Sequence, residues 1–567
     1  MKSRGRDTIA CLVLVTMVCP LLCVATASDT RDQLTVQHLF DANIPEIVDN
    51  RYFQPIGTTG PSSHRLSGTL HFTETRMTTR HPDSDWKGGG QTYFPAFSLE
   101  VISHEDHLIP LERGIILSGE IHQSFWNIIV SPGKIWRETG DNGYSRAALP
   151  FTLTDSYIGQ TRNGVATFVF NNVEISPVAM QITQESAPVV DYVQTDFRAS
   201  IPLDYEPEEL PERERTIQEF QKELAAMMPT RPWSELPDAE LTRSLFSLMV
   251  APDAVSAGAL IIDDVLYVQP VETRSAGAFP FPQAMRHGVF SVTKTLATSL
   301  SMLYVAERYG EQVFNTLITD YVPELASHPG WSGVTFEHAL GMVTGVEAVD
   351  SGARMVPYLR ARSAVQKLAA IRDFPDAPPR PGETFHYAST NTFVLSYALN
   401  QYVKAREGPD ADYWTLVRQD VLEPMGIPHV PVSRTVEADG SLGVPQAGYG
   451  AYPTLGETAR IAKLFRDEGV FEGRQLLHKG RVREAMHRTS RRGFDAGSGR
   501  RYLHAMWLLP IDTRSCGGID VPTMSGLGGN LILFPPSGLI AIRFADADDY
   551  QPEPMVWAAE HYRSSCH

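Results

Sequence analysis

The chain has 567 residues, of which 43% are hydrophobic and 20% are charged, and its formal net charge is -17 at pH 7. This is the composition of an ordinary globular protein with room for several domains. An acidic surface argues against nucleic acid as a partner, because phosphate binding requires clustered lysine and arginine.

The first 27 residues have the pattern of a secretory signal peptide, with a basic start, an apolar stretch over 9–24 and a small-residue cleavage site. The basic residues and the cleavage site are Lys2, Arg4, Arg6 and Ala25-Thr26-Ala27. We therefore expect export, periplasmic or secreted, after cleavage near Ala27. A lipid anchor on Cys23 is the alternative, although Leu22 stands where a small residue is expected. No other stretch has the roughly 18 apolar residues of a membrane span.

Five cysteines are present, and three of them lie in the predicted signal peptide. Cys516 and Cys566 remain in the mature chain. An even pair in an exported protein favours one disulfide, which would close the C-terminal segment. Two free thiols are the alternative, because sequence alone does not place the two Cα atoms within reach.

Residues 28–203 contain short runs rich in β-branched and aromatic residues, separated by Gly, Asn, Asp and Pro. Examples are Phe97–Ile102, Trp126–Val130 and Ala166–Phe170. This texture predicts an all-β N-terminal domain, a sandwich or a barrel, whose role the sequence does not indicate. Residues 204–234 are predicted to be an acidic, proline-interrupted linker followed by a helix at 212–227.

Residues 235–567 mix strand and helix patterns. Strands are predicted at 260–262, 265–268, 530–534 and 539–544, and helices at 291–309, 335–342, 363–371, 390–404, 413–424, 456–468 and 553–562. Strands at both ends with helices between them predict one antiparallel sheet that is built from both ends of the domain and covered by helices, an α+β architecture.

The pattern Ser-x-x-Lys occurs three times, but only Ser291 opens a helical pattern. Ser131 to Lys134 contains Pro and Gly, and Ser84 to Lys87 runs into three glycines. On a helix, Ser291 and Lys294 project from the same face, and the helix start favours developing negative charge. A nucleophile, an amine and an electropositive backbone together suit acyl transfer. The alternative is that Ser291 is only an N-cap.

Two later segments could complete such a site. Tyr387 lies in a polar loop before another apolar helix, and it could share a proton with Lys294 and Ser291; it could equally be an amphipathic wedge at the helix start. Residues 524–530 are rich in glycine, which lets a backbone approach a ligand closely. A backbone N–H there could pair with that of Ser291 as an oxyanion hole, or the glycines could only form a tight turn.

The order Ser-x-x-Lys, tyrosine motif, glycine-containing strand motif resembles the serine β-lactamase and penicillin-binding-protein family, specifically its class C-like branch. Segments 331–345, 423–427 and 448–477 also resemble that family, and the resemblance covers roughly 240–560. It implies a β-lactamase/transpeptidase-like fold for 235–567. The all-β domain lies outside it.

The resemblance also implies a two-step acyl transfer with Ser291, Lys294 and Tyr387 as catalytic residues. Ser291 would attack a carbonyl, and Lys294 and Tyr387 would handle the proton. The backbone N–H groups of Ser291 and Gly529 would hold the oxyanion, and water would release the acid. The resemblance implies no metal and no organic cofactor.

The chain departs from the family at two places. The family's Tyr-x-Asn is Tyr387-Ala388-Ser389 here, with Asn391 two positions further on. We therefore take Ser389, Asn391 and Gly528 as candidate substrate-binding residues. The family's Lys-Thr-Gly or His-x-Gly is represented by Gly526-Leu527-Gly528, without a basic side chain. This absence favours an esterase or amidase of less acidic substrates over an efficient β-lactamase or carboxypeptidase.

We therefore expect an exported serine hydrolase that acts on an ester or amide in a small-molecule or peptide substrate. Two other functions remain open. One is a binding protein whose hydrolase fold has lost activity, which the altered glycine motif leaves possible. The other is a cell-wall D-amino-acid peptidase. The sequence does not indicate the oligomeric state.

Overall fold

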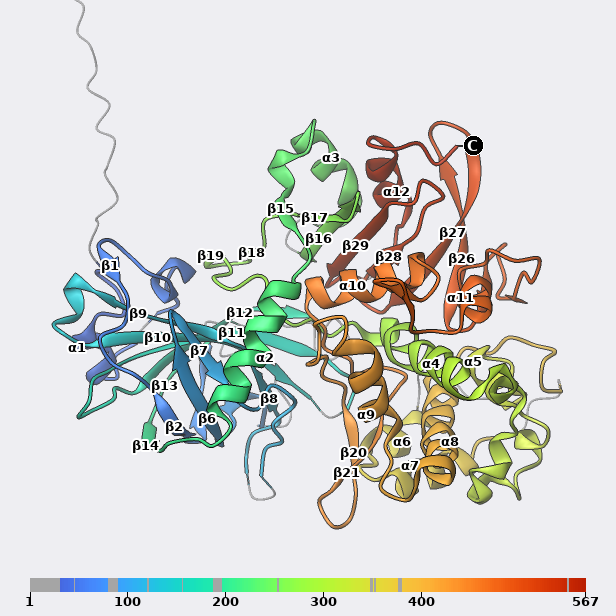
Figure 1. The fold of residues 1–567 in the computed structure, drawn as a ribbon, viewed down its shortest axis with the longest axis horizontal. Helices are drawn as coiled ribbons and strands as arrows, with labels where there is room; N and C mark the ends of the chain where they lie inside the picture. Colours follow the sequence, from blue (N-terminus) through green and yellow to red (C-terminus); the bar gives the residue numbers. More distant parts are fainter. Residues whose placement is uncertain are drawn as a thin grey trace, which may run out of the picture.

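The computed structural model describes residues 31–566, except for 45, 80–89, 120–121, 156, 187–195, 252–253, 347–349, 351–352, 376–379 and 548–549. The predicted signal peptide lies outside the described residues. Figure 1 shows a β-rich lobe formed by the N-terminal part of the chain beside a mixed lobe formed by the rest.

The β-rich lobe contains a twelve-stranded sheet in the order β14-β2-β6-β7-β9-β10-β11-β12-β13-β4, with β1 on β9 and β8 on β10. Every pairing in this sheet is antiparallel. Its strands are β1 (Thr59–Gly60), β2 (Ser67–Phe72), β4 (Thr78–Thr79), β6 (Phe97–His104), β7 (His107–Pro110), β8 (Asn127–Val130), β9 (Gly133–Glu138), β10 (Ser145–Thr154), β11 (Thr161–Phe170), β12 (Val178–Ser186), β13 (Phe197–Ile201) and β14 (Leu203–Pro207).

This sheet curls around one apolar core. β13 and β14 are consecutive in the chain and joined at Pro202, yet β13 pairs with β12 and β14 pairs with β2 at the other end of the sheet. The inward side chains of β11, such as Phe168 and Phe170, enter the enclosed core, while Val165 and Val169 pack on the outer face against the segment that contains α1 (Val36–Phe40). Alternation of side chains along the strand explains this division. Helix α2 (Arg213–Ala226) crosses the outside of β6 and β7 (Figure 1).

The mixed lobe is built on a nine-stranded sheet in the order β15-β17-β16-β29-β28-β27-β26-β25-β24. The strands are β15 (Thr230–Pro232), β16 (Val255–Ile262), β17 (Val265–Val268), β24 (Phe494–Asp495), β25 (Arg501–Leu503), β26 (Met506–Thr513), β27 (Gly517–Gly526), β28 (Asn530–Leu533) and β29 (Ile540–Ala545). All neighbours are antiparallel except β15 and β17. The prediction of one sheet built from both ends of this region is confirmed.

Helices cover both faces of this sheet. On β28, Leu531 and Leu533 face α3 (Ala239–Phe246) and α12 (Glu553–Glu560), whereas Ile532 faces the larger core. That larger core lies among α4 (Leu300–Tyr309), α5 (Phe336–Leu340), α6 (Met355–Arg360), α7 (Ala364–Arg372), α8 (Ser389–Glu407), α9 (Tyr413–Val417), α10 (Leu455–Arg466) and α11 (Lys479–Ala485). Figure 1 shows α4 to α9 gathered below the sheet in that view.

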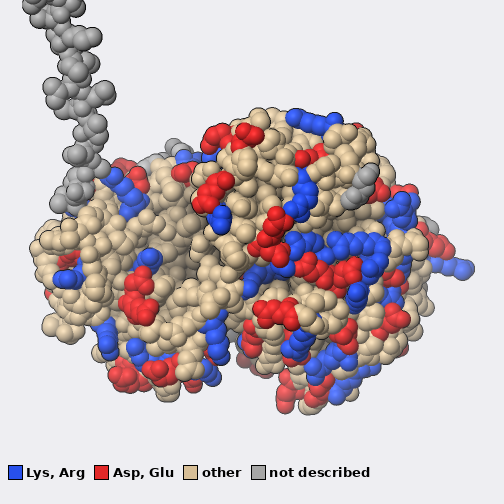
Figure 2. All heavy atoms as spheres, turned by 45° about the horizontal axis from the view of Figure 1, so that its top comes forward, with Lys and Arg blue, Asp and Glu red and all other residues tan. Residues whose placement is uncertain are grey.

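Short two-stranded pairs complete the described strands. They are β3 (Thr75–Arg76) with β5 (Tyr93–Phe94), β18 (Glu272–Thr273) with β19 (Gly277–Ala278), β20 (Arg434–Val436) with β21 (Leu442–Pro445), and β22 (Val470–Phe471) with β23 (Arg474–Gln475). Acidic and basic side chains are interspersed over the face of the mixed lobe that Figure 2 shows.

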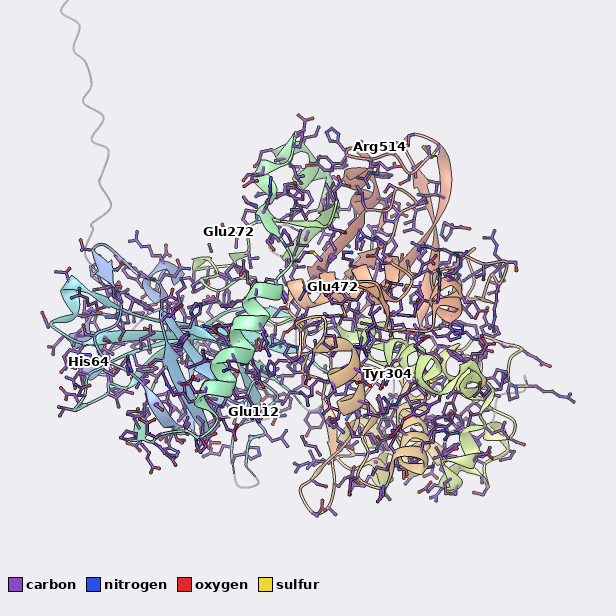
Figure 3. All side chains as sticks on the ribbon, viewed as in Figure 1. His64, Glu112, Glu272, Tyr304, Glu472 and Arg514 are labelled. Atoms are coloured by element: carbon purple, nitrogen blue, oxygen red, sulfur yellow. A yellow bond between two sulfur atoms is a disulfide. The ribbon has the colours of Figure 1, made fainter. Side chains whose placement is uncertain are left out.

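The helix predicted over 291–309 is α-helical only in its second half. It begins as a 3-10 turn, Phe290–Val292, continues as a π-helix, Lys294–Ser299, and becomes α4 at Leu300. Side chains inside the π segment explain part of this geometry, because Thr298 donates a hydrogen bond to the Ala447 carbonyl at 2.7 Å. π segments occur frequently at functional sites. Tyr304 of α4, labelled in Figure 3, donates a hydrogen bond to the Asp420 carboxylate.

The β-rich lobe directly supports the segment that precedes Ser291. Asn163 at the start of β11 donates to the Arg286 carbonyl at 2.9 Å, and the Gly288 N–H donates to the Thr161 hydroxyl at 3.4 Å. Both side chains of β11 are buried. The segment 286–288, which leads to Ser291, is therefore hydrogen-bonded to the β-rich lobe.

The predicted disulfide is present. Cys516, in the turn between β26 and β27, is bonded to Cys566, which follows α12 in the sequence. The two Cα atoms are 5.7 Å apart. Arg514 in the same turn lies over the Trp557 ring of α12 at 4.7 Å, and Figure 3 places Arg514 at the outer edge of the mixed lobe. Among the described residues, no helix combines the length and apolar character required to cross a membrane.

Replacing Cys516 and Cys566 together with serine should lower the melting temperature of a protein made of residues 28–567. The bond closes a loop with a sequence separation of 50 residues, and a disulfide of this kind contributes about 2–4 kcal/mol to the free energy of unfolding. Thermal unfolding with and without reductant provides the measurement. Wild type should be sensitive to reductant and the double variant insensitive; equal melting temperatures under oxidising conditions would contradict the prediction.

Candidate active site

Ser291 lies at the first turn of the interrupted helix, half-buried, directly after a strained residue. Phe290 has φ 45°, in the left-handed region that a bulky side chain rarely adopts, and its side chain is buried. Such conformations cost about 1–3 kcal/mol and persist only where the surrounding packing enforces them. They concentrate at functional sites, so Ser291 stands at a position that the fold holds under strain.

Lys294 is 1% exposed, and its amino group makes three hydrogen bonds. It donates to the Ser291 hydroxyl at 2.9 Å, to the Ser389 hydroxyl at 2.8 Å and to the Gly448 carbonyl at 2.9 Å. Three donors on three acceptors match the N–H groups of an ammonium. The predicted pair of Ser291 and Lys294 is therefore in direct contact, at the spacing that the helical pattern indicated.

Ser389 is the first residue of α8 and is buried beside Lys294. Its hydroxyl, besides accepting from Lys294, donates to the Asp350 carboxylate at 2.7 Å. Its backbone N–H donates to the other carboxylate oxygen of Asp350 at 2.6 Å. Ser389 therefore uses its hydroxyl within the protein, between a lysine and a carboxylate, rather than leaving it open for a substrate.

Gly448 brings a carbonyl oxygen to Lys294 because it has no side chain. A Cβ at this position would lie 2.8 Å from the Ser389 Cβ and 2.9 Å from the Ser389 carbonyl oxygen. The preceding residue, Ala447, has φ 58° and accepts the hydrogen bond from Thr298. The loop after β21 is thus shaped to bring its backbone against both Lys294 and Ser389.

Tyr387 contacts Lys294 with the face of its aromatic ring. The Lys294 Nζ lies 4.7 Å from the ring centroid, a cation–π contact. Among the described residues, the Tyr387 hydroxyl has no hydrogen-bond partner, whereas the ring packs against Phe385, Tyr502 and Trp507 with centroids 5.6–6.3 Å away. Tyr387 is therefore close to the lysine as the sequence predicted, but by its aromatic face.

Asn391 lies two residues after Ser389 on α8 and points elsewhere. It is buried, accepts a hydrogen bond from the Thr344 hydroxyl at 3.4 Å, and has its amide nitrogen 3.8 Å from the Met342 sulfur. The structure does not bring it to Lys294. Its contacts instead fix the loop of residues 342–344, in which Met342 has φ 60°.

Gly526, the last residue of β27, lies close to Ser291. A Cβ at Gly526 would lie 2.2 Å from the Val289 carbonyl oxygen and 3.2 Å from the Ser291 amide nitrogen. Gly528 and Gly529 follow in the turn with φ 87° and 79°. The Gly528 carbonyl accepts from Ala547, and the Gly529 carbonyl lies 3.4 Å from Arg543 Nε.

The other Ser-x-x-Lys sequences do not form a comparable pair in the described structure. The Ser131 hydroxyl donates to the Ala284 carbonyl at 3.4 Å, whereas Lys134 pairs with Asp106 at 3.7 Å. The proline and glycine between them place the two side chains on different partners. The sequence from Ser84 to Lys87 lies outside the described residues.

Two residues of this site were missed by sequence reasoning. Asp350 lies outside every motif of the sequence, five residues after the segment 331–345, and no spacing connects it with Ser389. Gly448 opens the segment 448–477, which resembles the family, but its carbonyl contact with Lys294 depends on a loop conformation that the pattern of residue types does not encode. Both are supplied by loops, where backbone shape rather than periodicity decides which atoms meet.

One cluster has the residue types of a metal site. The ligand atoms of Glu337, Glu484 and His504 lie within 4.8 Å of one another. Arg481 and Arg491 contact the same carboxylates at 2.7–3.4 Å. Burial alone would raise the pKa of Glu484, but hydrogen bonds from His504 and Arg481 outweigh it and lower the pKa to about 2. The acids are already neutralised by arginine, so this cluster is an ion-pair network that links α5 to α11.

A cavity of about 1190 Å³ lies between the two lobes. Residues of the β-rich lobe, among them Phe125 and Tyr157, line one side, and residues of α6, of α9 and of the segments that follow these helices line the other. Ser291 and Lys294 are not among its lining residues. It meets the site only indirectly through Gln446, which lines the cavity and lies two residues before Gly448.

No protein-family model matches the sequence, and no curated protein matches it. Several solved structures are similar. A penicillin-binding protein homologue from Caulobacter crescentus is 17% identical with TM-score 0.42, covering 57% of this chain and 96% of that one. An octameric penicillin-binding protein homologue from Pyrococcus abyssi is 17% identical with TM-score 0.43, covering 58% and 78%. A D-stereospecific amidohydrolase from Streptomyces sp. is 14% identical with TM-score 0.41, covering 57% and 98%.

These names agree with the family that the sequence motifs resemble. The similarities are too distant to transfer a substrate or a residue's role. What the site does therefore has to follow from its own atoms.

Replacing Gly526 with alanine should displace Ser291, because the added Cβ would overlap the Val289 carbonyl. We expect the rate at which a fluorophosphonate probe labels Ser291 to fall on the order of a hundredfold, as expected for a reacting atom moved by about 1 Å. Gly456→Ala is the matched control, because a Cβ there meets no atom closer than 4.0 Å. Labelling of both variants at the wild-type rate would show that Gly526 does not position the serine.

Proposed function

We propose that this protein is a serine hydrolase that cleaves an ester or amide through an acyl-enzyme on Ser291. One observation carries the proposal: the Lys294 amino group lies 2.9 Å from the Ser291 hydroxyl, on a lysine that is 1% exposed. A lysine whose every N–H is directed at protein oxygen atoms is fixed in orientation, and its position beside a serine hydroxyl is that of a base activating a nucleophile.

The proposed reaction has two steps. Ser291 Oγ attacks the substrate carbonyl carbon while its proton passes to a neutral Lys294, and the proton then goes to the leaving group as the bond to that group breaks. Water attacks the resulting ester of Ser291 with Lys294 as the base, and the acid departs. Positioned proton transfer of this kind contributes about 100- to 10,000-fold to the rate.

The oxyanion hole is proposed to lie between Ser291 and the end of β27. Gly526 lies against the Ser291 amide nitrogen, and the turn after β27 begins at the next residue. We therefore propose the N–H of Leu527, besides that of the Gly529 inferred from the sequence, as the second donor. Two backbone N–H groups aimed at the carbonyl oxygen would stabilise the charge that develops there.

An apolar wall beside the nucleophile favours neutral substrates. Phe385, Tyr387 and Trp507 are half-buried and packed on one another, and Leu527 in the neighbouring turn is 38% exposed. Residues 524–530 carry no basic side chain, and Arg500 is already stacked over the Trp507 ring at 5.8 Å. Burying an apolar acyl group against this wall is favourable, at about 25 cal/mol per Å², whereas a substrate carboxylate would find no lysine or histidine in the strand motif.

The mature chain should hydrolyse a short-chain p-nitrophenyl ester, and Ser291→Ala should lower that activity by at least about a thousandfold, as removal of a nucleophile does. Ser131→Ala is the matched control, because Ser131 belongs to a second Ser-x-x-Lys sequence whose lysine lies elsewhere. A chromogenic cephalosporin, assayed in parallel, should be turned over more slowly than the ester.

Activity that survives Ser291→Ala would overturn the proposal. If neither protein turns over the ester or the cephalosporin and a fluorophosphonate probe leaves Ser291 unlabelled, the binding-protein function considered from the sequence is the better one. Cephalosporin turnover as fast as that of dedicated resistance enzymes would overturn the preference for neutral substrates.

Proton handling by Ser389 and by Tyr387 can be separated. The Ser389 hydroxyl is bonded to Lys294, whereas the Tyr387 hydroxyl is bonded to no described residue. We therefore expect Ser389→Ala to lower kcat for the ester about a hundredfold, and Tyr387→Phe to retain most of it, because the ring contact with Lys294 is kept. The reverse order would assign the proton to the Tyr387 hydroxyl, as the family resemblance implied.

A further inference from the structure

We propose that Asp350 is a positioning residue that accepts the Lys294 proton through Ser389 and so makes Lys294 available as a base. The inference rests on the proposed hydrolase function and adds to it a residue that no sequence motif contains. It starts from the three contacts that link Lys294, Ser389 and Asp350 in a line.

The Lys294 amino group is surrounded by three oxygen atoms. In its ammonium form, Lys294 can direct one N–H at each of three oxygen atoms that lie 2.8–2.9 Å away. An ammonium cannot take the Ser291 proton. A proton must first leave, and the three acceptors decide where it can go.

The three acceptors differ in whether they can pass a proton on. The Gly448 carbonyl cannot pass a proton on, and the Ser291 hydroxyl is the group to be deprotonated. The Ser389 hydroxyl accepts from Lys294 and donates to Asp350, so among the three it alone is bonded onward to a carboxylate in the described structure. A hydroxyl that accepts on one side and donates on the other can relay a proton without moving.

The buried charge of Lys294 also favours a transfer of its proton to Asp350. Lys294 forms no ion pair with any described residue, although it is buried, and an unpaired buried charge is costly. Asp350 lies one hydroxyl away and is exposed on its other side. Moving one proton along this line leaves both Lys294 and Asp350 neutral, so the transfer removes the buried charge.

The step is balanced in protons. Lys294 gives one proton to the Ser389 oxygen as Ser389 gives its hydroxyl proton to Asp350, which leaves a neutral amine and a carboxylic acid. The amine then takes the Ser291 proton as Ser291 Oγ bonds to the carbonyl carbon, and the carbonyl electron pair moves onto oxygen. Lys294 returns that proton to the leaving group, and the relay runs backward after deacylation.

A structural role for Asp350 gives a different expectation. A carboxylate at the first residue of a helix also caps it and interacts favourably with its dipole. Asparagine keeps the size of the side chain and an acceptor oxygen for the Ser389 N–H, but it cannot take a proton. Asp350→Asn therefore preserves a cap and abolishes a relay.

The experiment measures the second-order rate at which a fluorophosphonate probe labels Ser291 in the mature chain, together with the melting temperature. We expect Asp350→Asn to lower the labelling rate about a hundredfold with the melting temperature unchanged, and Asp350→Glu to recover part of the loss. Asp439→Asn is the matched control: Asp439 accepts from both the N–H and the hydroxyl of Ser441 at 3.0 and 2.6 Å, as Asp350 does from Ser389. It should label at the wild-type rate.

Two further measurements distinguish a proton relay through Asp350 from a purely structural role as a helix cap. Because the relay runs through Ser389, adding Asp350→Asn to Ser389→Ala should cause no further loss, whereas independent effects would multiply. Sodium formate should raise the labelling rate of Asp350→Ala above that in sodium chloride of equal ionic strength. Labelling of Asp350→Asn at the wild-type rate, or multiplicative losses, would overturn the proposal. Failure of the wild-type protein to label at Ser291 would instead refute the hydrolase function itself.

Discussion

The amino group of Lys294 has to find three acceptors in a place from which water is nearly excluded, and the mixed lobe is arranged around this requirement. The acceptors come from three separate parts of the chain: the turn that precedes the π-helix, the start of α8 and the loop after β21. A buried donor without a partner costs about 1–3 kcal/mol, and more when it is charged. Each of these parts is therefore held in position by one side chain that they share, and Ser291 is held with them.

The backbone conditions for this arrangement are met at a few residues. Gly448 and Gly526 are places where any Cβ would overlap a neighbouring atom, and both lie against the groups that surround Ser291 and Lys294. Phe290 is held at φ 45° immediately before the serine. Strain of this kind needs support, and part of it comes from outside the lobe, because β11 of the β-rich lobe binds the backbone at Arg286 and Gly288. The N-terminal sheet thus takes part in holding the site, whatever else it binds.

The sequence was informative where the relevant distances are short along the chain. Ser291 and Lys294 are three residues apart, so helical geometry alone brings them together, and the strands at 260–268 and 530–544 were visible as apolar runs. It was uninformative where a loop decides. Asp350 and Gly448 reach Lys294 and Ser389 from loops distant in sequence, and the choice between Leu527 and Gly529 as the proposed second oxyanion donor depends on the turn after β27. The helix predicted over 291–309 is α-helical only from Leu300 onward; its first half is a 3-10 turn and a π segment, in which the Thr298 side chain bonds to the loop at Ala447.

The departure at Ser389 and the position of Asp350 have one explanation. Where the family pattern has an asparagine, an amide oxygen could only accept a hydrogen bond from the lysine, and its nitrogen could only donate. A serine hydroxyl at the same place is shorter and does both, so a carboxylate can approach from the far side and receive the hydroxyl proton. In the proposed mechanism Ser389 connects Lys294 to Asp350, so the tyrosine hydroxyl is not needed to carry a proton, and the Tyr387 ring covers the lysine as part of the aromatic wall. The altered motif would thereby change the proton path while the serine and the lysine stay as they are.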